Sequence, residues 1–77
     1  MRKSIFTKLQ KRLCVVLKRE RKDAGLTQKQ VAKKLGAYPA YVSKYETGER
    51  RLDVIEFLAV AQAIGFDPKA IIAELEQ

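Results

Sequence analysis

Apolar residues in the first third of the chain recur at steps of three and four positions. The set consists of Phe6, Leu9, Leu13, Val16 and Leu17. Such spacing places side chains along one side of an α-helix. We therefore predict a first helix from Ser4 to Ala24. Gly25 follows it, and glycine readily adopts the left-handed conformation that ends a helix.

Two short helices are predicted next. Thr27 is a good N-cap, with Gln30 at capping-box spacing, so a second helix is expected at Gln28–Leu35. Its inward-facing residues are Val31, Ala32 and Leu35. Gly36 closes this helix, and Pro39 starts a third one, Pro39–Glu46, because proline is favoured at the first helical position. Val42 and Tyr45 are expected on its buried side, and Thr47-Gly48 ends it.

The last third of the chain predicts two more helices. Asp53 caps a fourth helix, with Glu56 at capping-box spacing. This helix carries the apolar residues Val54, Phe57, Leu58, Val60, Ala61 and Ile64, and Gly65 stops it. Asp67-Pro68 opens a fifth helix with Ile71, Ile72 and Leu75 as its apolar positions. Because no segment alternates as a strand does, we predict one all-α domain of five helices spanning residues 1–77.

Composition narrows the chemistry. Hydrophobic residues make up 47% of the 77 residues, enough for a single core. The chain has one cysteine and no histidine, which argues against an internal disulfide, the usual zinc sites and the commonest general base. We expect no enzymatic activity, no metal and no cofactor. Cys14, flanked by apolar residues, is expected to be a buried thiol.

Positive charge is concentrated at the start of the chain. The net charge is +7, and residues 1–22 hold nine basic side chains against Glu20 alone. The remaining residues hold seven basic and eight acidic side chains, so they are nearly neutral. Such asymmetry indicates a polyanion or an anionic surface as partner. A merely solvated helix face is the alternative.

The basic start of the chain does not have the pattern of an export signal. Its longest apolar run, Leu13 to Leu17, has five residues and is closed by Lys18-Arg19. A signal peptide or a membrane span needs a longer apolar stretch. The expectation is a cytoplasmic protein with no membrane partner.

The second and third helices have the spacing of a helix-turn-helix, with its core at residues 28–46. Counted from Gln28, Ala32 is fifth, Gly36 is ninth and Val42 is fifteenth. A small residue suits the point where the helices cross, and glycine suits the tight turn. A branched apolar residue at Val42 would hold the second helix of the motif in place.

Three segments carry a resemblance to a known family: GLTQKQVAKKLG (25–36), YVSKYETGERRLDV (41–54) and AIGFDP (63–68). They resemble the XRE-type regulators, which share the helix-turn-helix of Cro and the phage repressors. The match covers about residues 17–75. The chain most resembles small stand-alone members of the family that have a long first helix. Here a basic helical segment of about residues 1–12 extends that helix at its N-terminal end. The resemblance implies a phage-repressor-like fold and sequence-specific binding of double-stranded DNA. It also implies a homodimer and transcriptional regulation, most often repression.

Site residues follow from this resemblance by position. The base-facing positions of the recognition helix are Pro39, Ala40 and Lys44. Gln28 would meet a phosphate and brace the first recognition residue. Positions that commonly meet the DNA backbone or a neighbouring base are Tyr41, Ser43, Thr47 and Arg50. From their place in the chain we add Arg51, directly after Arg50, and Tyr38, whose hydroxyl could reach a phosphate. The alternative roles are turn solubility for the arginines and apolar cover for Tyr38 and Tyr41.

The recognition helix departs from the family pattern at its start. Bidentate bonds to adenine need Asn or Gln, and those to guanine need Arg or Lys. Pro39 and Ala40 offer only apolar contact to a thymine methyl, which leaves Lys44 as the candidate for guanine. We hypothesise that few bases are read directly and that phosphate contacts, DNA shape and dimer spacing supply much of the specificity. A binding-site selection with many strongly fixed positions would contradict this.

Two structural roles are also predicted. The family pairs an arginine late in the first helix with a glutamate at the end of the recognition helix, which predicts an Arg21–Glu46 ion pair. Tyr45 is expected in the core. The dimer contact is left open between the first helix, through Ile5, Phe6 and Leu9, and the fifth helix. Each of these groups could instead complete the core.

Two other functions remain open. The first is the antitoxin of a toxin–antitoxin pair, which uses this fold and would have a protein partner. The second is an interaction module whose basic first helix binds RNA or an acidic membrane surface. The weak donor set at Pro39-Ala40 supports that module, while Gln28, Lys44 and Arg50 argue against it.

Overall fold

The computed structural model describes the backbone of residues 3–77 and the side chains of residues 7–77. The described residues form five helices and no strand. The helices are α1 (Lys3–Asp23), α2 (Gln28–Leu35), α3 (Pro39–Thr47), α4 (Val54–Ile64) and α5 (Pro68–Leu75). The predicted all-α architecture is confirmed, and the helix ends that we predicted differ from these by at most one residue.

Local hydrogen bonds explain where α2 and α4 begin. The Gln30 amide N–H donates to the Thr27 hydroxyl over 3.1 Å, and the Thr27 amide N–H donates to the Gln30 side chain over 2.9 Å. Asp53 and Glu56 exchange the same pair of bonds, at 2.7 and 2.9 Å. Both are the reciprocal capping boxes that the sequence predicts.

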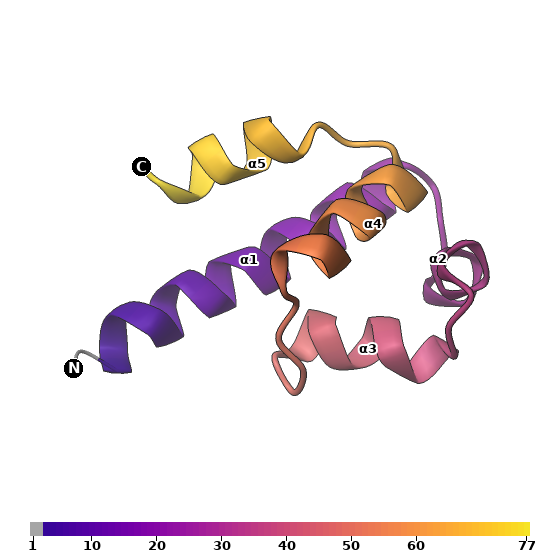
Figure 1. Ribbon diagram of the computed structural model, residues 1–77, viewed down its shortest axis with the longest axis horizontal. Coiled ribbons are helices and arrows are strands. Elements are labelled where there is room, and N and C mark those ends of the chain that lie inside the picture. The colour runs from indigo at the N-terminus through magenta and orange to yellow at the C-terminus, as the bar shows by residue number, and fades with distance from the viewer. Residues whose placement is uncertain (1–2) are drawn as a thin grey trace.

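The long α1 runs the length of the molecule; α2, α3 and α4 pack around its second half, and α5 lies along its first half and middle (Figure 1). In that view α4 lies in front of α1, α3 lies below and α5 above, while α2 closes the far end. The largest fully buried core side chains are Leu17, Val31, Val42, Tyr45 and Val60. They come from α1, α2, α3 and α4, and Ile71 of α5 joins the same cluster. The predicted core role of Tyr45 is confirmed, and Cys14 is buried as expected.

Several apolar residues of the predicted helix stripes are exposed instead of buried. The exposed ones are Leu9, Val54, Leu58 and Ile72. Leu9 is 42% exposed because the first half of α1 extends beyond α3 and α4 (Figure 1). Ile5 and Phe6, which we predicted to pack on the fifth helix or on a partner, lie outside the described side chains.

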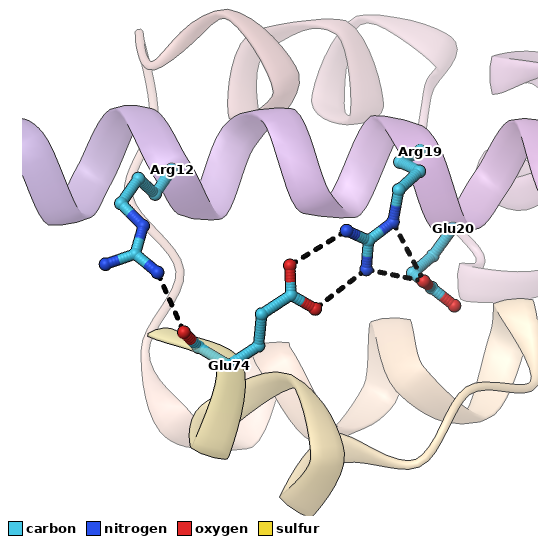
Figure 2. Close-up of polar contacts among 4 residues, drawn as sticks. All are labelled: Arg12, Arg19, Glu20 and Glu74. Atoms are coloured by element: carbon cyan, nitrogen blue, oxygen red, sulfur yellow. Dashed lines mark hydrogen bonds and ion pairs between the residues drawn. The ribbon is translucent and has the colours of Figure 1, made fainter. Parts of the chain in front are cut away.

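Two arginines of α1 hold α5 in place, and both converge on Glu74 (Figure 2). Arg12 donates to the carbonyl oxygens of Glu74, Leu75 and Gln77, at 2.7, 3.2 and 3.3 Å. These bonds serve the last carbonyls of α5, whose C-cap Glu76 is not a left-handed glycine. Arg19 grips the Glu74 carboxylate with two bonds of 2.8 and 2.9 Å.

Replacing Glu74 by glutamine is expected to lower the melting temperature at neutral pH, with the effect fading in acid. Its bonds from Arg19 hold the pKa of Glu74 below its usual value. A carboxyl with a lowered folded pKa stabilises the fold above its unfolded pKa of about 4.3 and loses that contribution as pH falls through the folded pKa. Thermal unfolding followed by circular dichroism at pH 7 and pH 3 measures this. E76Q removes the same charge from an exposed residue and is the control. Equal melting curves for E74Q and E76Q at pH 7 would contradict it.

Candidate nucleic-acid interface

A tight turn at Gly36 joins α2 to α3. Gly36 has φ of 68°, in the left-handed region that favours glycine. The Ala37 amide N–H closes the turn by donating to the Ala32 carbonyl over 2.9 Å. Ala32 and Val42, the other two positions of the motif, are both completely covered. The structure thus has the predicted helix-turn-helix, with α3 as its second helix.

One side of α3 is open to solvent. Ala40, Lys44 and Thr47 follow each other at steps of four and three, so they share a helix face, and all three are exposed. Pro39 is also exposed and Ser43 is half-buried, while Tyr38 just before the helix is 84% exposed. The opposite side carries the buried residues Val42, Tyr45 and Glu46. Of the three predicted base-facing residues, Ala40 and Lys44 therefore share the open side of α3, and Pro39 is exposed as its first residue.

A buried ion pair holds α3 against α1. The Arg21 Nε donates to the Glu46 carboxylate over 2.6 Å and its Nη2 donates over 3.1 Å. Both residues are more than nine-tenths buried. The remaining arginine nitrogen donates to the Leu26 carbonyl over 2.9 Å. The hydrogen bonds with Glu46 raise the pKa of Arg21. The Arg21–Glu46 pair predicted from the sequence is confirmed.

Gln28 has a partner that the sequence did not predict. Its amide nitrogen donates to the Glu46 carboxylate over 3.0 Å, so the buried pair also anchors the first residue of α2. A primary amide has two N–H donors. One N–H of Gln28 thus orients the side chain, and the other is available for a phosphate oxygen. The predicted phosphate contact stays a prediction.

Glu56 organises the loop after α3. Its carboxylate pairs with Arg50 and accepts the Tyr41 hydroxyl over 3.2 Å. The Arg50 guanidinium also lies over the Tyr41 ring, 4.9 Å from its centroid. The backbone bond from Asp53, together with Arg50, holds the pKa of Glu56 below its usual value. Sequence reasoning found Glu56 only as a capping residue, since its contact with Tyr41 depends on how α3 meets α4.

These bonds bear on two of the predicted backbone contacts. Tyr41 donates its hydroxyl hydrogen to Glu56, so it can donate to a phosphate only by giving up that bond. Arg50 bonds Glu56 through one nitrogen and is half exposed, which leaves further N–H donors. Thr47 donates its hydroxyl to the Lys44 carbonyl over 3.2 Å. Arg51 is exposed and lines a groove with Leu9 and Ile72.

Comparisons with known proteins agree with this geometry. A family model described as helix-turn-helix matches residues 17–71, which include α2, α3 and α4. No curated protein matches the chain.

Solved structures extend the comparison to the whole fold. The chain is similar to an XRE-family like protein from Pseudomonas syringae pv. tomato, with a TM-score of 0.92 and 44% identity over 96% of this chain and 90% of that one. It is also similar to the clp gene regulator ClgR from C. glutamicum, with a TM-score of 0.80 and 25% identity over 88% of each chain. The restriction-modification controller protein C.Esp1396I shares the fold, with a TM-score of 0.79 and 22% identity over 87% of this chain and 88% of that one.

Proposed function

The chain belongs to the helix-turn-helix family, as an XRE-type DNA-binding regulator of transcription, and from this premise we propose that it is a repressor that binds its operator as a homodimer. The family is one of DNA-binding regulatory domains and not of enzymes. ClgR, a clp gene regulator, and the controller protein C.Esp1396I share its architecture and support a regulatory role. The cytoplasm is the compartment that fits this role. No described helix combines the length and the apolar character that a bilayer crossing requires.

The observation that carries this proposal is the anchoring of α3. Val42, Tyr45 and the Arg21–Glu46 pair fix its inner side, while Lys44 and its neighbours stand free on the outer side. An exposed helix on a rigid support is what insertion into a major groove requires. Lys44 is the one exposed side chain on this face with a donor suited to guanine O6 and N7.

We assign roles within this surface by exposure and by free donors. Lys44 reads a base directly, and Pro39 and Ala40 pack against thymine methyl groups. The backbone contacts are proposed for Gln28, Tyr38, Tyr41, Ser43, Thr47, Arg50 and Arg51. Of these, Gln28 and Arg50 meet the DNA with donors that their internal bonds leave free. Phosphate contacts set the register of the protein on the duplex, and base contacts supply the specificity.

The homodimer is supported by apolar side chains that the monomer leaves exposed. Leu9, Ile55, Leu58 and Ile72 are all more than 40% exposed. A groove of about 670 Å³ also opens between the first half of α1 and the end of α5, lined in part by Leu9, Leu13, Ile72 and Leu75. Because both helices line it, the interface would draw on both the first and the fifth helix. A dimer places two recognition helices on two half-sites.

The decisive measurement is the affinity of the purified protein for DNA upstream of its own gene and for scrambled duplex, across a salt series. We expect at least a thousand-fold preference for the upstream DNA, which is about the lower limit for specific DNA-binding proteins. Sedimentation in the same buffer is expected to give a dimer, and a reporter fused to that promoter is expected to fall when the protein is expressed. Equal weak binding to both duplexes would count against the proposal. A reporter that rises would exclude repression.

A further inference from the structure

Four lysines of α1 form a straight row. Lys8, Lys11, Val15, Lys18 and Lys22 follow one another at steps of three, four, three and four, which keeps them on one face of the helix. All five side chains are exposed. At 1.5 Å per residue, the row is about 21 Å long.

The row lies on the outer face of α1, between the side that contacts the recognition helix and the side that contacts α5. Cys14 of α1 lies against the end of α3, because the Cys14 sulfur would be 3.8 Å from a Cβ placed on Gly48, the C-cap of α3. Lys11 and Lys18 are three residues before and four residues after Cys14, so they are its neighbours on the helix surface. Lys11 and Lys18, the central lysines of the row, therefore lie on the side of α1 toward α3, whereas Lys8 lines the groove beside Ile72 and Leu75 of α5.

Within the described part of α1, the arginines and the lysines are used differently. Arg12 and Arg19 bind α5, and Arg21 binds Glu46 (Figure 2 shows the first two). No side chain of these four lysines forms an ion pair or a hydrogen bond with another residue whose side chain the structure describes. The arginines complete the fold, and the lysines leave an unneutralised strip of positive charge on a surface that no described helix covers.

We propose that this lysine row binds the phosphates of the DNA beside the segment that α3 reads. The proposal deepens the proposed function and rests on it. Neighbouring lysines repel one another at these spacings, and phosphate groups relieve that repulsion. Lysine binds phosphate as a flexible point charge, so such contacts add affinity without regard to base sequence. The row would lengthen the footprint of a helix that carries few direct base donors.

A pair of double variants tests the row. K11Q/K18Q removes two charges from its centre, and K34Q/K69Q removes two exposed charges from α2 and α5 as the matched control. Lys34 lines a hollow with Ala59 and Gln62 of α4, so it is turned toward α4. Neither pair contributes ion pairs among the described residues, so both variants are expected to unfold at the wild-type temperature.

The readout is the salt dependence of binding to a random-sequence duplex, which needs no knowledge of the operator. Each lost phosphate contact makes the negative slope of log K against log salt shallower by about 0.9, so the slope for K11Q/K18Q should be shallower by about 1.8. The control should keep the wild-type slope. Equal slopes for both variants would overturn the row proposal, whatever the wild-type protein does on its operator.

Two further outcomes keep the proposals separate. If the wild-type protein shows no preference between upstream and scrambled DNA, the repressor proposal fails, but a slope lost only in K11Q/K18Q still supports the row. Vesicles containing phosphatidylserine serve as the second probe. Vesicle binding that is lost in K11Q/K18Q, with the DNA slope unchanged, would assign the row to a membrane surface and overturn its assignment to DNA.

Discussion

Replacing Glu46 by alanine is expected to lower the free energy of unfolding by about 3–5 kcal/mol, because it leaves a buried arginine without its partner. Arg21 is 7% exposed and donates two hydrogen bonds to Glu46. The substitution also removes the acceptor for Gln28. Small domains are stable by only about 5–15 kcal/mol, so E46A would bring this one close to unfolding.

Urea denaturation of E46A beside the double variant R21M/E46L measures the effect. Replacing both charges of a buried pair by apolar side chains of similar size is usually neutral or stabilising. We therefore expect the double variant to regain most of the stability that E46A loses. A loss below about 1 kcal/mol in E46A, the size of an exposed pair, would show that the pair is open to water in solution.

The double variant also separates folding from DNA binding. It retains the apolar core but leaves Gln28 without the bond that orients it. If Gln28 meets a phosphate, R21M/E46L should fold normally and bind operator DNA more weakly. The control is K29Q, because Lys29 is exposed and follows Gln28 directly in the chain. Gln30 is unsuitable as a control position because it belongs to the α2 capping box.

Replacing Lys44 by alanine is expected to lower the preference for the operator by about 5- to 150-fold, the range that corresponds to about 1–3 kcal/mol for a good base contact. Lys44 is exposed on the open side of α3 and has no ion-pair partner among the described residues. Its loss should weaken binding to the operator far more than binding to random duplex.

Competition binding with the selected operator and with single-base variants of it measures this preference. K44A should bind two duplexes almost equally well, namely the operator and the operator variant in which the contacted guanine is replaced. R51A, a proposed phosphate contact, should weaken both duplexes alike and lower the salt slope by about 0.9. A uniform loss in K44A as well would make Lys44 another phosphate contact and leave α3 without a direct base donor.

Two carboxylates hold side chains of the proposed interface in place through hydrogen bonds and ion pairs. Glu46 binds Arg21 and Gln28, and Glu56 binds Arg50 and Tyr41. Glu46 is buried and Glu56 is half-buried. Both hold side chains that carry N–H or O–H donors in defined positions before DNA binds. Such preorganisation lowers the entropy that binding would otherwise cost.

The helices and the motif follow from the sequence because their causes are local. Capping boxes at Thr27 and Asp53, glycine at Gly36 and proline at Pro39 each act within a few residues. The family resemblance also predicted one long-range contact, the Arg21–Glu46 pair, which spans 25 residues in sequence. Pattern and resemblance together were enough for the five helices, the turn and the exposed face of α3.

The burial of individual side chains and the choice of hydrogen-bond partners depended on the packing of the helices. Leu9 and Ile72 belong to regular apolar stripes, yet they are exposed because nothing in the described chain covers that end of α1. Glu56 reaches Tyr41 only because α3 and α4 meet at the loop that carries Arg50. The split between engaged arginines and free lysines on α1 also arises from where α3 and α5 lie against it. A periodic pattern tells which residues share a face, but contacts between faces form only when the helices pack.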